Sequence, residues 1–164
     1  MTASIRITEV RSGLDVTADL LADRAPDTVA FLMAYLERPR IVPGLHAMWT
    51  GPEISCPIPS DHLDAAVRAV PLSPENATLT PEAGDLVMAY VPPRVWGGNP
   101  EPIFDIGLFY GPNARMLFPI GWLAGSVVGK VRPAQRAALA DACGRIRRAG
   151  ACEITFTLEA GGGA

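Results

Sequence analysis

The chain has 164 residues, of which 49% are hydrophobic and 19% are charged, and its formal net charge is −3. A slightly acidic chain without a basic stripe offers no electrostatic attraction for nucleic acid, so we expect no nucleic-acid partner. The charged share lies below the roughly 25% of ordinary soluble domains, and this favours a homodimer or higher homo-oligomer, or a large apolar pocket.

The cysteines and the N-terminal pattern indicate a compartment. Three scattered cysteines (Cys56, Cys143 and Cys152) suit reduced thiols in a cytoplasm better than a disulfide framework. The first residues alternate in polarity and lack the apolar core of a signal peptide, so we expect a cytoplasmic protein. One core can serve a chain of this length. We therefore expect a single domain over residues 1–160, followed by a flexible tail over residues 161–164.

The first part of the chain predicts a hairpin, a helix and a pair of strands. Residues 4–10 and 14–21 flank a Ser-Gly turn, which is typical of a β-hairpin. A helix is expected to begin at Pro26, because proline suits the first helical turn and the apolar residues that follow repeat at helical spacing. Prolines end that helix, and residues 45–50 and 53–58 are expected to form a strand pair around Gly-Pro.

The second part of the chain is expected to be mostly strand. Residues 61–70 could form one short helix, and strands are expected over residues 76–80, 86–91, 103–110 and 115–131. A second helix is expected to begin at Arg132-Pro133, with one apolar face and several arginines, Arg147 among them, on its outer side. A last strand over residues 152–159 completes the pattern.

The most informative feature is a charge-free segment over residues 116–129, between Arg115 and Lys130. It is too short for a transmembrane helix, which needs about 20 apolar residues. Pro119 and three glycines oppose a helix, whereas the valine-rich end of the segment favours a strand. A strand this apolar must be covered on much of both faces, so we expect it to run through a closed barrel or sandwich.

The order of these elements predicts a mainly β protein of the α+β type. A closed antiparallel β-barrel covered by two helices, one over each opening, removes exposed strand edges and buries the charge-free segment. The first helix is apolar on one side only. That pattern suits the covering of a barrel better than binding to a membrane, so we expect no membrane partner.

Five segments of the chain follow one another in a characteristic order: Ala-Pro-Asp-Thr (25–28), Leu-His-Ala-Met-Trp-Thr-Gly-Pro-Glu (45–53), Glu-Asn-Ala-Thr (75–78), Gly-Asp-Leu-Val (84–87) and Leu-Ala-Gly-Ser-Val-Val-Gly-Lys (123–130). With these segments in this order, the chain resembles an uncharacterised bacterial family that is defined by a domain of unknown function. The resemblance implies a closed, cyclophilin-like β-barrel and no settled activity. Peptidyl-prolyl isomerases of the cyclophilin class carry Phe-His-Arg and Gln-Gly-Gly-Asp motifs, which this chain lacks, and fold analogy alone does not supply function.

His46 and Glu53 are candidate catalytic residues. A histidine titrates near neutrality, so His46 could move protons in a pocket; the alternative is a half-buried strand histidine bonded to a carbonyl group. Glu53 could orient His46, or act as a base if burial raised its pKa; the alternative is a solvated turn residue. Cys56 is expected to be a small buried hydrophobe rather than a nucleophile.

Tyr110 is the third candidate catalytic residue. Strand alternation points Tyr110 the same way as Phe104, and if that face lines the barrel, the Tyr110 hydroxyl needs a partner or a ligand there. Asp105 would then face outward or towards a covering helix. Phe104 is a candidate substrate contact, as is Tyr90, which shares a strand face with Met88.

Four further residues are candidate substrate contacts. Arg115 could hold a carboxylate at a barrel mouth, or it could be a solubilising flank. Trp96 and Trp122 could form walls around an apolar ligand, or they could simply fill a core. Trp49 lies on the strand face opposite His46, so the two residues line one cavity only if a bulge intervenes.

The sequence carries no signal for a metal or a cofactor. Its two histidines and three cysteines lack the spacing of metal ligands, so we expect no metal site. The glycine motifs that bind phosphate or dinucleotides and the Gly-x-Ser-x-Gly elbow are missing as well, so we expect no cofactor.

Two functions therefore stay open, both with a small organic molecule as the partner. The first is a cofactor-independent enzyme of the isomerase, cyclase or lyase type, which uses shape and one or two acid–base groups in or beside the barrel. The alternative is a non-catalytic module that binds a metabolite or docks on a partner enzyme. Peptidyl-prolyl isomerisation is a third possibility, weakened by the missing motifs.

Overall fold

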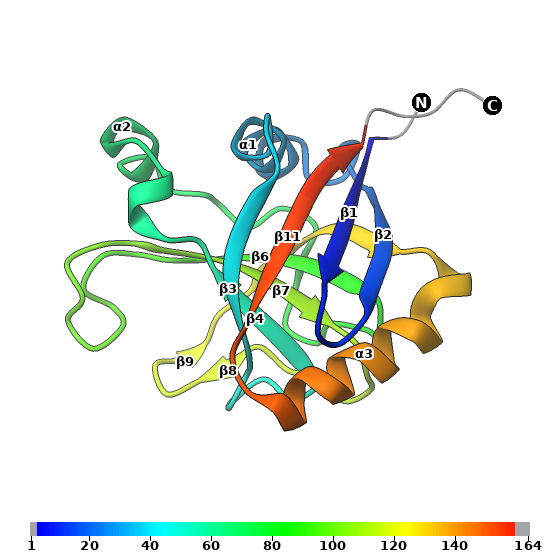
Figure 1. Ribbon diagram of the computed structural model, residues 1–164. Helices are drawn as coiled ribbons and strands as arrows, with labels where there is room; N and C mark the ends of the chain where they lie inside the picture. The colour runs from blue at the N-terminus through cyan, green and yellow to red at the C-terminus, as the bar shows by residue number, and fades with distance from the viewer. Residues whose placement is uncertain (1–2, 160–164) are drawn as a thin grey trace.

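A computed structural model describes residues 3–159, and its strands close into an antiparallel barrel (Figure 1). Eight strands follow in the order β2-β1-β11-β3-β4-β7-β6-β10, and β10 pairs back to β2. Closure leaves the barrel without a free edge strand, and the predicted mainly β barrel is confirmed. The strands are β1 (Ser4–Glu9), β2 (Leu14–Leu20), β3 (Arg40–His46), β4 (Glu53–Pro57), β6 (Asp85–Val91), β7 (Ile103–Phe109), β10 (Gly125–Val131) and β11 (Cys152–Glu159), with the short β5 (Ala77–Thr78) beside β10.

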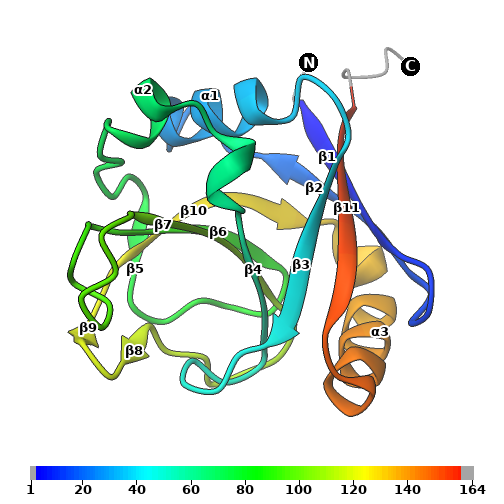
Figure 2. The same cartoon turned by 60° about the vertical axis from the view of Figure 1, so that its left-hand side comes forward.

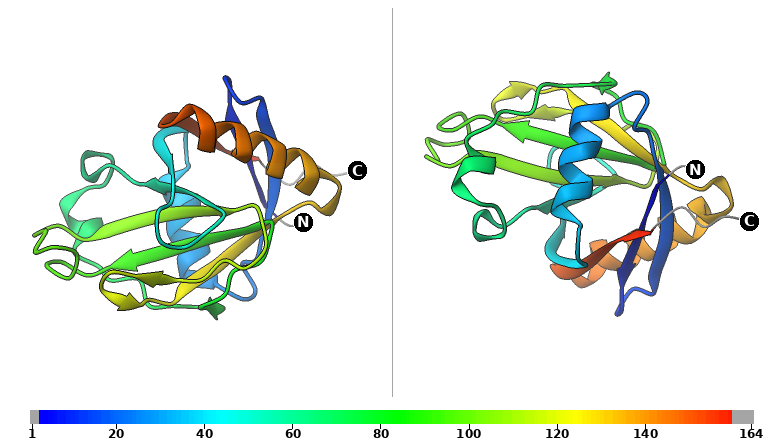
Figure 3. Two further views of the ribbon diagram at one scale, coloured as in Figure 1. Left: turned by 90° about the horizontal axis from the view of Figure 1, so that it is seen from below. Right: turned by 90° about the horizontal axis from the view of Figure 1, so that it is seen from above.

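Two helices lie at opposite ends of the barrel, as Figures 1 and 2 show. In the view from above in Figure 3, α1 (Pro26–Tyr35) lies across the strands, and in the view from below α3 (Arg136–Ala149) lies in front of them. Each helix turns its apolar face to the barrel, as the helical spacing predicts. The buried residues are Thr28, Val29, Leu32 and Tyr35 in α1 and Leu139, Ala142, Cys143 and Ile146 in α3.

The segment expected as one short helix over residues 61–70 is divided in the structure. A 3₁₀ turn, η1 (Ser60–His62), precedes a single helical turn, α2 (Ala65–Arg68). A second 3₁₀ turn, η2 (Pro133–Gln135), leads into α3. Within residues 3–159, no helix has both the length and the apolar character needed to cross a membrane.

The charge-free segment corrects one prediction. Only β10 is a barrel strand, whereas β8 (Leu117–Phe118) and β9 (Gly121–Trp122) form a separate hairpin, so the continuous strand expected over residues 115–131 is wrong in its first half. Pro119 cannot donate to a strand ladder, and Gly121 adopts a positive φ of 102° that suits a turn. The first five residues of β10 are buried, so the expected covering of both strand faces is confirmed for that part.

The strand expected over residues 45–50 lies earlier in the chain. β3 runs through Pro43, and residues 47–52 form a loop. β4 pairs with only two residues of β3, Leu45 and His46. Pro43 therefore has β11 on one side and no strand partner on the other. A residue without an N–H is tolerated at such a free edge.

The barrel interior is filled with apolar side chains. Ile54, Leu86, Ile106, Leu108 and Phe156 are fully buried there. An outer cluster covers the other face of β6, β7 and β10 beneath the segment that carries β8 and β9, and it contains Val87, Ala89, Phe109, Ala114, Met116 and Val127. Because the interior is filled, a ligand has room at the ends of the barrel rather than in its middle.

The remaining expectations concern the thiols and the tail. All three cysteines are unoxidised; Cys56 and Cys143 are buried, and burial raises the pKa of the Cys56 thiol well above its usual value. A thiol with a raised pKa is a poor nucleophile, which agrees with its expected role as a buried hydrophobe. The expected tail over residues 161–164 lies outside the described residues.

Candidate functional site

Strand β7 carries candidate residues to both ends of the barrel. Phe104, Ile106 and Leu108 share one strand face, as alternation predicts; this face points into the interior, and Tyr110 follows directly after the strand. At about 3.3 Å per residue, Phe104 and Tyr110 lie roughly 20 Å apart. The predicted site residues therefore divide between two places, which we call the α1-end pocket and the α3-end groove.

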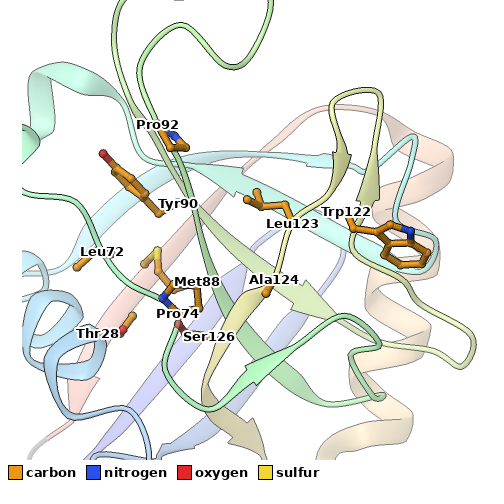
Figure 4. Close-up of a pocket in the computed structure, with 10 residues that line it drawn as sticks. All are labelled: Thr28, Leu72, Pro74, Met88, Tyr90, Pro92, Trp122, Leu123, Ala124 and Ser126. Carbon is orange, nitrogen blue, oxygen red and sulfur yellow. The ribbon is translucent and has the colours of Figure 1, made fainter.

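The α1-end pocket is a cavity of about 320 Å³ beneath the N-terminal part of α1 (Figure 4). Its walls come from α1, the segment 72–74, β6, the connection after β9 and the start of β10. None of its lining residues carries a charge. They are Thr28, Leu72, Pro74, Met88, Tyr90, Pro92, Trp122, Leu123, Ala124 and Ser126.

Stacked aromatic rings support one wall of the α1-end pocket. Tyr90 meets Phe104 edge to face with ring centroids 5.1 Å apart, and Phe31 of α1 stacks on Phe104 at 5.1 Å. Offset and edge-to-face contacts of this kind hold rings in fixed orientations. Tyr90 and Trp122 line the pocket, as the substrate-contact prediction requires, with the half-exposed Trp122 at its rim (Figure 4). Phe104 does not line the pocket itself but packs against Tyr90, which does.

Glu75 fastens the segment over residues 71–75, which we call the strap, across this end of the barrel. Its carboxylate accepts hydrogen bonds from the Thr28 backbone N–H and the Thr28 hydroxyl, both at 2.8 Å, and from the Asp27 N–H at 3.3 Å. Ala25, the residue before α1, provides no side-chain cap, so Glu75 supplies one from a distance. These bonds to Thr28 and Asp27 lower the pKa of Glu75.

The hydrogen bonds of Glu75 leave two hydroxyl groups at the pocket wall that can each form one further hydrogen bond. Thr28 donates its proton to Glu75, so its oxygen can still accept a hydrogen bond. Ser126 Oγ accepts the Glu75 N–H at 2.9 Å, a bond that does not use the Ser126 hydroxyl proton. Beyond the strap lies a second hollow of about 560 Å³, which shares Thr28 and Leu72 with the pocket.

The α3-end groove is an open hollow of about 610 Å³ at the other end of the barrel. His46 Nε2 and the Tyr110 hydroxyl are hydrogen-bonded there at 2.8 Å. Burial lowers the pKa of His46, and the positive charge of Arg147 on α3 lowers it further, while a bond with the Ala47 backbone opposes both. Burial raises the pKa of Tyr110, and Arg147 opposes that change. Two predicted catalytic residues, His46 and Tyr110, thus lie in contact.

Glu53 lies away from this groove. The β3–β4 register places His46 opposite Ile54, so Glu53 belongs to the outer strand face, where only 3% of it is exposed. The Thr50 hydroxyl donates to its carboxylate, which lies against Gly107. The structure therefore does not bring His46 and Glu53 together.

A second carboxyl group lies near Glu53 on that outer face. Asp105 accepts a hydrogen bond from Ser55 Oγ at 2.7 Å, and its other oxygen is buried without a partner among the described residues, although the residue as a whole is partly exposed. Burial raises the pKa of Glu53, and the neighbouring Asp105 adds to the rise. Burial also raises the pKa of Asp105. Asp105 faces outward, which was one of the two orientations expected for it.

Three predicted contact residues lie outside both sites. Trp49 is 46% exposed in the loop between β3 and β4. Trp96 packs edge-on against Phe118 of the β8–β9 hairpin, with ring centroids 5.9 Å apart. Arg115 is exposed, and its backbone N–H bonds to the Thr50 carbonyl at 3.0 Å. These positions leave the assigned roles as predictions.

Other residues of the two sites were missed by sequence reasoning. Thr28 and Ser126 carried no signal, because an isolated hydroxyl residue in a helix or strand is ordinary. Arg147 was assigned to the outer side of its helix, and it does lie there, but β3 and β7 end beside it. Within residues 3–159, no group of three or more acidic, histidine or cysteine side chains is arranged to hold a metal ion.

The fold is shared with solved structures. No match was found among curated proteins. The chain is similar to the structure of McbB in complex with tryptophan, with a TM-score of 0.66, 22% identity, and coverage of 98% of this chain and 46% of McbB. It thus spans about half the length of McbB. It is also similar to the solution structure of the hypothetical protein AF2241 from Archaeoglobus fulgidus, with a TM-score of 0.53, 19% identity, and coverage of 95% and 94%.

These similarities show a common fold, the cyclophilin-like barrel that the sequence resemblance implied. The family comparison covers almost the same part of the chain as the barrel itself. Residues 7–158 match the family described as "Protein of unknown function (DUF3830)". The chain therefore belongs to the DUF3830 family.

Proposed function

We propose that this protein binds a small organic molecule in the α1-end pocket. The observation that carries the proposal is the pocket itself: a cavity without charged walls, with a supported aromatic ring and two hydroxyls whose hydrogen-bonding capacity is unused. Binding sites for small molecules combine mostly apolar walls with a few placed polar groups in this way. McbB, which has been solved in complex with tryptophan, shares the fold, and this supports an organic ligand.

The walls of the pocket indicate the chemistry of the ligand. Burying a charge without a partner is costly, so the part of the ligand inside the pocket is uncharged. A donor on the ligand can bond to Thr28 Oγ1, and an acceptor can receive the Ser126 hydroxyl proton. A volume of about 320 Å³ is near the lower end for ligand sites and suits one or two rings. Indole, a flat neutral molecule with one N–H donor, is a suitable probe.

Methionine methyl groups provide separate reporters for the two sites. Met88 lines the α1-end pocket and Met48 lines the α3-end groove. In protein labelled with ¹³C at the methionine methyls, we expect indole to shift the Met88 signal in a saturable manner and to leave Met48 unchanged. The Met88 and Met48 signals are assigned with Met88→Leu and Met48→Leu.

A variant that fills the pocket tests the location. Ala124→Leu places three further carbon atoms in the cavity and is expected to abolish the indole shift of Met88. Ala137→Leu makes the same change on the exposed face of α3 and is expected to leave it intact. An unmoved Met88 signal in the unmodified protein, or equal indole binding by the Ala124→Leu protein, contradicts the proposal.

A finer form of the proposal is a cofactor-independent isomerase or cyclase. The pocket walls would hold one reactive conformer of the substrate, and Tyr90 would be the acid–base group, because its ring lines the cavity. The alternatives are separated by incubating the protein with a natural ligand and analysing the ligand by mass spectrometry. If the ligand is converted and the Tyr90→Phe variant converts it more slowly, the enzyme is supported. If the ligand is recovered quantitatively unchanged, a non-catalytic binding module is supported. Cytoplasmic location and homo-oligomer formation stay predictions, the second testable by sedimentation.

A further inference from the structure

We infer that the α3-end groove is a second ligand site, which takes a small carboxylate with an apolar tail. Arg147 pairs with the carboxylate, and the hydrogen-bonded His46 and Tyr110 lie beside it. This inference does not depend on the α1-end pocket, because the filled barrel interior separates the two sites. It assigns to His46 and Tyr110 a ligand that lies outside the barrel.

The charge of the groove carries the first step. Its lining residues include one permanent positive charge, Arg147, and no carboxylate; they are His46, Ala47, Met48, Gly51, Pro52, Tyr110, Gly111, Pro112, Ala140 and Arg147. Elsewhere, Arg6 and Arg132 are paired with aspartates at 2.7 and 3.0 Å. Arg147 has no such ion pair within residues 3–159. Its guanidinium bonds to the Tyr110 side chain, and its remaining N–H groups can bind a carboxylate.

The His46–Tyr110 pair carries the second step. At 2.8 Å the two groups share one hydrogen bond, which holds the imidazole in a fixed orientation at the edge of the groove. The groups that influence this imidazole are Arg147 from α3, Tyr110 from the end of β7 and the Ala47 backbone. Burial and Arg147 both lower the pKa of His46, which favours the neutral imidazole. A bound anion would offset the Arg147 charge, so we expect carboxylate binding to raise this pKa.

The apolar walls carry the third step. Met48 is 78% exposed, and it lies with Pro52, Pro112 and Ala140 around the same hollow. An apolar tail on the ligand would cover this surface, which adds a favourable hydrophobic contribution. Benzoate combines a carboxylate with a flat apolar ring and is the probe of choice. Benzamide has the same shape without the charge and is the matched comparison.

The first experiment measures location and charge dependence together. We expect benzoate to shift the Met48 methyl signal and leave Met88 unmoved, and benzamide to shift Met48 at least fivefold less at equal concentration. Arg147→Gln is expected to weaken benzoate binding about fivefold, the upper range for an exposed ion pair. Arg148→Gln changes the neighbouring exposed arginine and is expected to leave binding unchanged.

The second experiment follows protonation. The chain has two histidines, so ¹H NMR titration resolves His46 beside His62, which bonds to Tyr35 at 2.9 Å and serves as an internal control. Benzoate should raise the pKa of His46, whereas the ring-proton signals of His62 at a fixed pH should not move when benzoate is added. Arg147→Gln should raise the pKa of His46 in the unliganded protein, because a neighbouring positive charge is removed, and should diminish the response to benzoate.

Three results overturn the inference. They are an unmoved Met48 signal with benzoate, equal responses to benzamide and benzoate, and equal weakening by Arg147→Gln and Arg148→Gln. None of these results bears on the proposal for the α1-end pocket, because that proposal is tested by the response of the Met88 signal to indole. A folded Arg147→Gln protein is verified by an unchanged Met88 methyl signal in the absence of any ligand.

Discussion

The two ends of this barrel are built on the same strand and differ in chemistry. At the α1 end, residues on α1, β6 and β10 and the segments around β9 and residues 72–74 form a pocket without charged walls. At the α3 end, the ends of β3 and β7 meet a helix that brings an arginine, and the hollow is open and contains one permanent charge among mostly apolar residues. Phe104 and Tyr110 belong to the same face of β7, so the face alone does not decide the role of a residue. The elements that cover each end decide it.

The filled middle of the barrel keeps the two ends apart. Leu108 lies between them on β7 and is fully buried. Leu108→Ala should lower the free energy of unfolding by about 2–5 kcal/mol, because it removes buried methyl groups and leaves a cavity. Urea denaturation checks this value. Leu45→Ala, at a position that is 41% exposed on β3, should cost far less. Equal losses in the two variants would show that the middle is not packed.

The outer face of the same strand provides a third environment. A Cβ added at Gly107 would collide with the Glu53 carboxylate, which Thr50 holds, and would lie 3.0 Å from Phe109 Cε2. We expect Gly107→Ala to lower the free energy of unfolding by about 1–3 kcal/mol. Gly144→Ala is the control, because its Cβ meets no atom closer than 3.8 Å and alanine favours a helix by up to about 1 kcal/mol. A stabilised Gly107→Ala protein would refute this packing.

The buried position of Glu53 on the outer face should be visible in how the stability of the protein depends on pH. Its pKa is raised in the folded protein from the usual 4.5, mainly by burial. The folded state therefore holds the proton more tightly, and stability falls as pH rises from that unfolded value through the raised folded value. Glu53→Gln should lessen the fall in Tm between pH 5 and pH 8 and be the more stable protein at pH 8. Parallel Tm profiles for the two proteins would contradict the buried position.

The smallest effect is expected at the strap. Glu75→Ala removes the acceptor of the Asp27 and Thr28 N–H groups. The amide protons of these two residues should exchange faster with solvent, and the Met88 methyl signal should move while Met48 does not. Glu37→Ala, an exposed change just beyond the other end of α1, should alter neither. Unchanged exchange at Thr28 would show that the strap is held by other contacts.

Elements with a clear local period could be predicted from sequence. Both strands of the first hairpin, the helices beginning near Pro26 and Arg132, and the last strand appear close to the expected residues. Alternation and helical spacing are properties of neighbouring residues, so one sequence contains them. The division of Phe104 and Asp105 between opposite faces of β7 followed for the same reason, whereas alternation did not indicate which face is inside.

Elements decided by distant partners could not be predicted. β3 passes through Pro43 because β11, from the end of the described chain, pairs along its other side. The β8–β9 hairpin separates from β10 although all three lie in one charge-free segment. The same limit applied to the sites: His46 meets Tyr110 across 64 positions of sequence, and Glu53 faces away from both because of the strand register. No local pattern contains these pairings.

The place of β11 in the sheet has a consequence for how the protein is made. This strand lies between β1 and β3, which both belong to the first 46 residues. Until a ribosome has released residues 152–159, those two early strands have a gap between them and each exposes an unpaired edge. Barrel closure therefore waits until residues 152–159 have been made, and it joins distant parts of the chain, which makes folding slow. During that interval the unpaired edges of β1 and β3 are sites at which edge-to-edge association can begin.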